Sequence, residues 1–265
     1  MKIGFIGLGN MATAMIGGML QKGMVEPRDV VGCDKLPEAM EKIKTKFNIT
    51  TVADNADVAG AADVLFLAVK PLFLPEVIAG IRDQVSAETL VVSIVAGKSL
   101  SWLREAFGRP ELKLVRCMPN TPALVLAGCT GVCAGEGVSA GELEKVLGLL
   151  GSFGTASVVP ERLMDVVVGV SGSSPAYVFL FIEAMADEAV AAGMPRPQAY
   201  EFAAQAVLGS AKMVLETGRH PGELKDMVCS PGGTTIEAVK VLEEKGFRGI
   251  VMDAVAACIE KSHNM

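Results

Sequence analysis

The sequence has few of the residues that build metal centres. It contains two histidines, His220 and His263, and six cysteines, none of which stands in a Cys-x-x-Cys pair. Protein zinc sites normally draw their ligands from closely spaced cysteines and histidines. We therefore expect no metal, and we expect reduced, mostly buried cysteines of the kind found in cytosolic proteins.

Basic runs and uninterrupted apolar segments are also absent. Twenty-four Lys and Arg against thirty Asp and Glu give a net charge of −6, which argues against a nucleic-acid surface. The first residues, MKIGFIGLGN, place glycines where a signal peptide would need an apolar run. The uncharged stretch 166–182 is broken by glycines, serines and Pro175, so we expect no membrane span there. The sequence thus predicts a cytoplasmic protein that binds neither nucleic acid nor membrane.

What is present divides the 265 residues into two parts with different patterns. The first part alternates helical patterns (11–21, 75–82 and 101–107 among them) with short β-branched runs at 2–6, 30–33, 64–69, 89–94 and 113–117, and 158–159 is its last expected strand. This alternation predicts a parallel sheet covered on both faces by helices. After Pro160 only helical patterns follow, at 177–192, 198–216, 236–244 and 249–261. We predict an α/β fold with a Rossmann-type doubly wound domain over 1–160 and an all-α domain over 161–265.

The first helix of the second part is apolar nearly all the way round (YVFLFIEAMADEAVAA). Such a helix must be buried, either within its own domain or against a second subunit. A set of about five helices has limited volume in which to hide it. The pattern therefore favours burial against a second copy of the chain.

The most recognisable ligand motif lies at residues 4–12, GFIGLGNMA. Gly7, Gly9 and Ala12 fit the pattern GxGxxG/A, and the motif follows a predicted strand and opens a predicted helix. The first glycine permits a tight turn, the second lets a pyrophosphate approach the backbone, and the third position allows close packing of helix on strand. The motif predicts a dinucleotide bound at this helix N-terminus.

The residues after the second strand, GCDK, leave the choice of dinucleotide open. Asp34 is placed to accept the ribose 2′-hydroxyl of NADH, whereas Lys35 could meet the 2′-phosphate of NADPH. Three further strand ends, LAVKP, IVAG and MPNTP, belong at the same edge of the sheet and should line the crevice for the nicotinamide. They bring Lys70, Asn120 and Thr121 to that crevice.

A second glycine-rich turn, CSPGGTTIEAV, covers residues 229–239. Two adjacent glycines let the backbone approach a ligand closely, and the amides that open the following helix would face an anion. The sequence therefore predicts two anion sites, one for the dinucleotide and one for a substrate carboxylate.

In order along the chain, the segments GFIGLGNMA, LAVKP, RCMPNTP, SGSSPAY, HPGELKD and SPGGTT resemble the pyrroline-5-carboxylate reductase family. The resemblance covers essentially the whole chain, and SPGGTT is its most specific part. It implies the reduction of Δ1-pyrroline-5-carboxylate to L-proline with NADPH or NADH. It also implies a Rossmann domain followed by a helical dimerisation domain, with dimers that commonly assemble into decamers.

The resemblance also implies roles for individual residues. Cofactor contacts are expected from the motif residues and the strand ends: Ile6, Gly7, Leu8, Gly9, Asn10, Met11, Ala12, Asn55, Ala68, Val69, Lys70, Pro71 and Asn120. Asp34 and Lys35 are expected cofactor contacts from their place after the second strand, and not from the resemblance. Substrate contacts are expected from Val228, Ser230, Gly233, Thr234 and Thr235. Asp34 departs from the serine, threonine or arginine that NADPH-preferring relatives tend to have there.

Thr235 is the expected catalytic residue. A cyclic imine that enters protonated needs no strong acid, so Thr235 can orient the ring nitrogen without titrating. Lys70 could instead serve as a general acid, although support of the cofactor or the turn is favoured. Ser171–Ser174 with Pro175, and His220 with Pro221, are expected to open helices.

Two rival functions stay open at this point. A reductase of a 3-hydroxy acid would need a catalytic lysine in the helical domain, for which Lys212 is a candidate, and it would leave SPGGTT without a role. A non-catalytic dinucleotide sensor would leave the second anion loop idle. Cofactor preference, oligomer size and activity on other cyclic imines also stay open.

Overall fold

The computed structural model describes all residues, 1–265, and separates them into two compact units. Unit 1 comprises Met1–Ser173 together with Cys258–Met265, and unit 2 comprises Ser174–Ala257. The predicted domain boundary at 160/161 stays a prediction.

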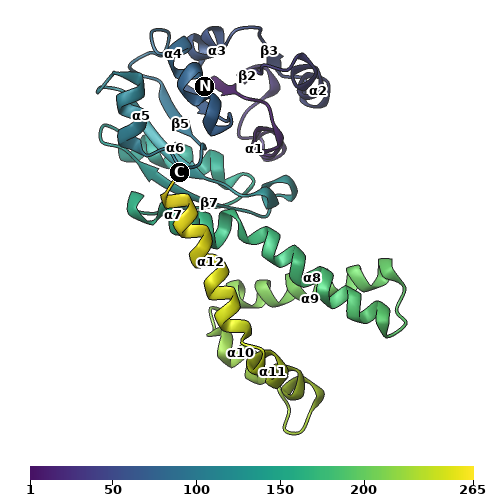
Figure 1. Ribbon diagram of the computed structural model, residues 1–265. Coiled ribbons are helices and arrows are strands. Elements are labelled where there is room, and N and C mark those ends of the chain that lie inside the picture. Colours follow the sequence, from purple (N-terminus) through teal and green to yellow (C-terminus); the bar gives the residue numbers. More distant parts are fainter. The chain divides into compact units, whose positions relative to one another are not determined.

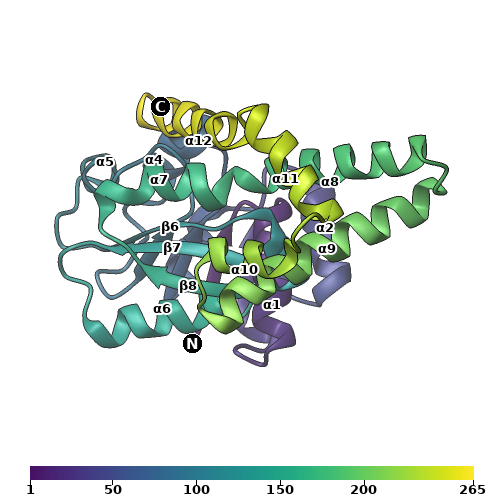
Figure 2. The ribbon, with the colours of Figure 1, turned by 90° about the horizontal axis from the view of Figure 1, so that it is seen from below.

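Unit 1 is built on an eight-stranded sheet with the order β3-β2-β1-β4-β5-β6-β7-β8 (Figure 1). Its strands are β1 (Ile3–Ile6), β2 (Val30–Cys33), β3 (Thr50–Thr51), β4 (Val64–Leu67), β5 (Leu90–Ser93), β6 (Lys113–Met118), β7 (Gly128–Ala134) and β8 (Gly154–Val158). The first six strands are parallel, whereas β7 pairs antiparallel with β6 and parallel with β8. The wholly parallel sheet predicted from the sequence is therefore wrong for the last two strands: β7 lies beside β6, and β8 lies beside β7 at the edge of the sheet (Figure 2).

Helices cover both faces of this sheet, as a doubly wound fold requires. They are α1 (Asn10–Gln21), α2 (Pro37–Phe47), α3 (Asn55–Ala61), α4 (Leu74–Ile81), α5 (Leu100–Phe107), α6 (Ala140–Gly151) and α7 (Met164–Val167), with short 3-10 helices at Pro27–Asp29, Pro71–Phe73 (η2), Thr121–Val125 (η3) and Glu161–Leu163 (η4) and a π-helix at Val168–Gly172 (η5). Phe5 and Phe66 stack 4.8 Å apart in the core that also contains Met15 and Phe153. Leu65 points into a second core on the opposite face. The predicted sheet with two buried faces is thus confirmed.

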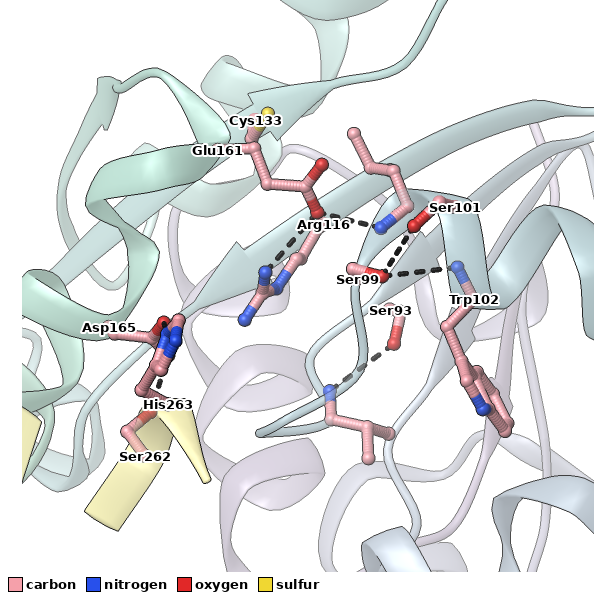
Figure 3. A network of polar contacts seen from close by, with 12 residues as sticks. Ser93, Ser99, Ser101, Trp102, Arg116, Cys133, Glu161, Asp165, Ser262 and His263 are labelled. Carbon is pink, nitrogen blue, oxygen red and sulfur yellow. Dashed lines mark hydrogen bonds and ion pairs between the residues drawn. The ribbon is translucent and has the colours of Figure 1, made fainter. Parts of the chain in front are cut away.

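Glu161 connects three elements of unit 1 (Figure 3). Its carboxylate accepts the backbone N–H of Leu100, at the start of α5, at 2.7 Å, and lies 3.2 Å from Nη1 of the buried Arg116 on β6. The carboxylate thereby offsets the charge of a guanidinium that the sheet would otherwise bury unpaired. The pair fixes the start of α5 to the middle of the sheet.

Unit 2 contains α8 (Ser174–Ala191), α9 (Arg196–Thr217), α10 (Pro221–Val228), α11 (Thr234–Glu244) and most of α12 (Phe247–His263). No strand follows residue 160, as predicted. His220 caps α10 by accepting the backbone N–H of Gly222 at 3.0 Å, which confirms the helix start expected there. The other expected start is confirmed at Ser174, whereas Ser171 lies in the π-helix and donates to the carbonyl of Val167.

The helix α8 hides little of its apolar surface within the chain. Ala186 is its only buried residue, and the large side chains of Val178, Phe179, Leu180 and Phe181 are exposed. The segment Glu161–Ala191 is long and apolar enough, by length and composition, to cross a membrane. A helix that packs against a second subunit has the same apolar composition as a membrane-spanning helix, because in both cases the apolar side chains must be covered.

Candidate functional site

The glycine loop between β1 and α1 shows why each glycine is required. Gly7 has φ +94°, and a Cβ there would lie 2.6 Å from the carbonyl oxygen of Ala68. Gly9 has φ −72°, and a Cβ there would meet nothing of the protein within 4 Å. The fold itself demands Gly7, whereas Gly9 keeps open a space in front of the loop, which is the space a pyrophosphate needs.

The helix α1 offers free donors to that space. Gly9 is its N-cap residue, and no side chain caps the helix. The first backbone N–H groups of a helix have no partner within the helix and carry its positive dipole end. An uncapped start behind a glycine that leaves room in front fits a bound pyrophosphate.

Asp34 holds this loop in place, which the sequence alone did not reveal. Its Oδ2 accepts the backbone N–H of Leu8 at 2.7 Å, and its Oδ1 accepts that of Leu36 at 2.9 Å. The amide of Gly7 donates to the carbonyl of Cys33 at 2.8 Å. The end of β2 therefore braces the glycine loop from the side. Each carboxylate oxygen keeps lone pairs for a further donor, so the predicted ribose contact remains compatible with this brace.

The end of β2 is acidic. The pKa of the Cys33 thiol is raised, first by burial and then by the negative charges of Asp34, Asp54 and Asp57. Asp54 caps α3 by accepting the backbone N–H of Ala56 at 2.9 Å, and Asn55 is the first residue of that helix. Asn55, predicted to reach the ribose, thus lies in the first turn of α3.

The strand end LAVKP lies at the same edge of the sheet. Ala68 donates its backbone N–H to the carbonyl of Ile6 at 2.8 Å, and this bond continues the β1–β4 pairing up to the glycine loop. Lys70 is exposed, and its side chain makes no hydrogen bond or ion pair, while its backbone carbonyl accepts the N–H of Phe73 at 3.0 Å. Pro71 follows it as the first residue of η2. The predicted cofactor residues of β1, β2 and β4 therefore meet around one loop.

Asn120 is buried and its amide is already engaged. Nδ2 donates to the carbonyl of Ser171 at 2.9 Å, and Oδ1 accepts the backbone N–H of Cys129 at 2.8 Å. The side chain joins η3, β7 and η5 into one scaffold. Its predicted contact with the nicotinamide stays a prediction.

In unit 2, the loop SPGGTT forms a tight turn into α11. Gly232 has φ +67°, and Gly233 donates its backbone N–H to the carbonyl of Ser230 at 3.0 Å. Gly233 is the N-cap of α11, and no side chain caps the helix. The hydroxyls of Ser230, Thr234 and Thr235 have no partner in the protein. This is the same combination of glycine turn and uncapped helix as at α1, and it suits a carboxylate.

Other candidate groups take no part in these sites. No group of three or more His, Cys, Asp or Glu side chains is arranged to hold a metal, and all six cysteines are free. Lys212, the candidate of the rival 3-hydroxy-acid reductase, pairs with Glu216 at 3.5 Å on the exposed face of α9. A lysine engaged at the surface in this way is not poised as an acid.

A doubly wound sheet whose first strand leads through this glycine loop into an uncapped helix defines a dinucleotide-binding oxidoreductase of the Rossmann type. Residues 2–97 match the family model described as NADP oxidoreductase, coenzyme F420-dependent, and residues 161–265 match the model for pyrroline-5-carboxylate reductase dimerisation.

Relatives of known identity cover the whole chain. A pyrroline-5-carboxylate reductase of Escherichia coli (strain K12) is 53% identical over 264 residues, which cover 100% of this chain and 98% of the relative. The structure of a pyrroline-5-carboxylate reductase from Coxiella burnetii superposes with a TM-score of 0.91 at 33% identity, over 99% of this chain and 97% of the other. The Plasmodium falciparum enzyme, crystallised with NADP bound, gives 0.90 at 32% identity, again over 99% and 97%. The chain belongs to the pyrroline-5-carboxylate reductase family.

Proposed function

We propose that this protein reduces Δ1-pyrroline-5-carboxylate to L-proline with NADPH or NADH, the last step of proline biosynthesis. The observation that carries the proposal is the pair of uncapped helix starts, each preceded by a glycine turn. One suits a dinucleotide pyrophosphate, and the other suits the carboxylate of a small substrate. Membership of the reductase family supports this assignment along the whole chain.

The dinucleotide is assigned to unit 1. Backbone donors of the loop hold its pyrophosphate, and the strand ends border the rest of the molecule through Ile6, Gly7, Leu8, Gly9, Asn10, Met11, Ala12, Asp34, Lys35, Asn55, Ala68, Val69, Lys70, Pro71 and Asn120. When bound, the reduced nicotinamide supplies a hydride to the imine carbon. NADP bound to the Plasmodium relative supports NADPH as a donor.

The substrate is assigned to the loop before α11. The backbone N–H groups at the start of α11, with Ser230, Gly233 and Thr234, hold the carboxylate, and Val228 lies beside the ring. Amides bind an anion without a charge of their own that must be desolvated. A carboxylate held in this way fixes the imine carbon for reaction, so much of the rate comes from positioning.

Thr235 is assigned to the ring nitrogen. Its hydroxyl has no partner in the protein, so it is free to accept a hydrogen bond from a protonated imine. The imine arrives as the cation, which is the better hydride acceptor, and no side chain of the loop has to give up a proton. Lys70, exposed and unpaired, supports the cofactor in this account and is not its acid.

The helical part is assigned to assembly. The family model for dimerisation matches residues 161–265, and α8 exposes a run of large apolar side chains. A homodimer formed through these helices covers that surface, and dimers that join into a decamer fit the same family. We place the enzyme in the cytoplasm, with a domain boundary at 160/161.

The experiment that tests the function is the oxidation of NADPH, and separately of NADH, on addition of pyrroline-5-carboxylate. Turnover with either nucleotide that requires the imine supports the reductase. Tight binding of both nucleotides without any turnover contradicts it and favours another imine or a dinucleotide sensor.

A further inference from the structure

The side chain of Lys35 reaches across the dinucleotide site to the ring of Phe73. Lys35 follows β2 and Phe73 ends the helix η2 that follows β4, yet Nζ of the lysine lies 5.5 Å from the ring centroid. In the sheet, β1 lies between β2 and β4. Strands two places apart are about 10 Å from each other, so the contact spans the carboxyl end of β1. That end is where the glycine loop begins.

The ammonium of Lys35 has no carboxylate partner, although Asp34 is its neighbour in the chain. Both oxygens of Asp34 accept backbone N–H groups, those of Leu8 and Leu36. The ring of Phe73 is the one group in the structure that Lys35 contacts through its charge. A ring face attracts a cation without neutralising its charge, so the N–H donors of Lys35 that point away from the ring remain available to a ligand.

Phe73 has an unusual position for a large apolar side chain. It is 40% exposed, and it lies in a 3-10 helix of three residues, outside both cores of unit 1. Burial in the core therefore does not account for it. Its contact with Lys35 does, since an aromatic face restricts where a long, flexible lysine side chain lies.

The carboxylates near the end of β2 make the position of the Lys35 ammonium important for the choice of cofactor. Asp34, Asp54 and Asp57 all act on the end of β2, where the adenine ribose of a Rossmann dinucleotide lies. Three carboxylates repel a ribose 2′-phosphate but tolerate a 2′-hydroxyl. A cation at the same place offsets that repulsion for NADPH alone, because NADH has no charge at the 2′ position.

We infer that Phe73 is a positioning residue that holds Lys35 as the cation for the 2′-phosphate of NADPH. The Lys35–Phe73 pair then sets the preference for NADPH over NADH, while Asp34 serves as a brace of the glycine loop. The inference rests on the proposed dinucleotide site, and it deepens that proposal by assigning the residues that distinguish the two cofactors.

Calorimetric titration with two fragments, adenosine 2′,5′-bisphosphate and adenosine 5′-monophosphate, tests the pair apart from catalysis. Lys35→Met should weaken the bisphosphate by about tenfold or more and leave the monophosphate within about twofold, because a charged hydrogen bond to phosphate is lost. Phe73→Leu should weaken the bisphosphate by roughly two- to fivefold, the range of an exposed cation–π contact. Phe73→Tyr should restore it.

Lys46→Met is the matched control. Lys46 also lies over a ring, 5.1 Å from the centroid of Phe47 at the end of α2, so its removal changes net charge and a cation–π contact in the same way. The control should change neither fragment by more than about twofold. The ratio of KM for NADPH to KM for NADH should follow the fragment affinities, with kcat nearly constant.

Three results would overturn the inference. They are a Phe73→Leu protein with unchanged bisphosphate affinity, equal losses for both fragments in Lys35→Met, and a control that weakens the bisphosphate as much as Lys35→Met does. If the protein shows the expected fragment affinities but does not reduce pyrroline-5-carboxylate, the role of the Lys35–Phe73 pair stands and the proposed reaction is contradicted. Failure of the inference can therefore be distinguished from failure of the proposed function.

Discussion

Ser262 donates its hydroxyl to Oδ1 of Asp165 at 2.7 Å, across 97 residues of chain (Figure 3). Oδ2 of the same aspartate lies 3.5 Å from Nδ1 of His263. At the end of the chain, Met265 packs against Gly97, where a glycine Cβ would lie 2.9 Å from the Met265 Cβ. The last turn of α12 is thus fastened to α7 and to the loop after β5 within unit 1. That loop lies at the carboxyl edge of the sheet, where the predicted cofactor residues also lie.

Loss of the hydrogen bond between Ser262 and Asp165 should lower the stability of unit 1. Ser262→Ala removes a largely buried hydrogen bond to a carboxylate and should cost about 1–2 kcal/mol of unfolding free energy, seen as a lower Tm in calorimetry. Ser157→Ala is the control, since that serine is exposed on β8 and makes no side-chain hydrogen bond. Equal Tm values for the two variants would contradict the role of the contact.

Substitution of the two loop glycines, Gly7 and Gly9, should have different effects on stability and on nucleotide affinity. Gly9→Ala should keep the stability of the protein and lose affinity for NADPH, because its Cβ meets only the space meant for the ligand. Gly7→Ala should lose at least about 1 kcal/mol of stability, since it combines φ +94° with a clash against Ala68. Denaturant unfolding and nucleotide titration measure the two effects.

Gly141→Ala, in the first turn of α6, is the control for both loop glycines. A Cβ there also meets nothing within 4 Å, and it lies far from the loop in the chain, so both readouts should stay near wild type. A Gly9→Ala protein with unchanged affinity for NADPH would contradict the assignment of the pyrophosphate to this loop.

Glu142 should make stability depend on acid pH. It forms a capping box with Ser139 at the start of α6 and lies 2.9 Å from Nζ of Lys113, and these partners lower the pKa of its carboxyl to about 2, the serine contributing most. The folded pKa is below the unfolded value of about 4.3, so the stabilisation is complete above that value and is lost as the pH falls toward about 2.

Glu142→Gln should lower the unfolding free energy by about 1 kcal/mol near neutral pH, because the capping box and ion pair weaken. Urea unfolding at about pH 7 and about pH 3 should show a smaller difference between wild type and variant in acid. Glu144→Gln, which removes an unpaired glutamate of the same helix, is the control. A difference that persists unchanged in acid would contradict the lowered pKa.

The thiols should react unequally in the native protein. Burial raises the pKa of Cys117 far above its usual range, and burial also raises the pKa of Cys33 and Cys133. Cys129 is exposed on β7. Because the thiolate is the reactive form, brief treatment with iodoacetamide should label Cys129 and spare the other three. Mass spectrometry of the digested protein locates the label, and a Cys129→Ser protein that still takes up label at Cys117 would contradict the account.

Most of the fold could be predicted because the parallel strands are short, apolar and separated by helical patterns. The strand β7 escaped prediction because its sequence, GCTGVCA, interrupts the β-branched pattern with glycine and cysteine. Gly131 is needed there because a Cβ would lie 2.9 Å from the side chain of Val167. The last strand was placed too late for a related reason, since β8 begins at Gly154, which has φ +152°.

The site was predictable where local sequence decides the geometry. Glycine turns and helix starts are local, and both glycine-rich turns with their uncapped helix starts lie where the motifs placed them. The roles of Asp34, Asn120 and Phe73 as braces and positioning groups depend on which residues the sheet order brings together. The spacing of residues along the chain does not predict such long-range contacts, so only the structure could identify them.

The central claim, that the loop before α11 holds the imine, is tested most directly by kcat/KM for pyrroline-5-carboxylate in Thr235→Ala. Thr217→Ala, at the end of α9, is the matched control, since its hydroxyl donates to the carbonyl of Met213. The account predicts a loss of about tenfold or more for Thr235→Ala, with the affinity for NADPH unchanged, because a hydrogen bond to a charged nitrogen is removed. A kcat/KM equal to that of the control would contradict it.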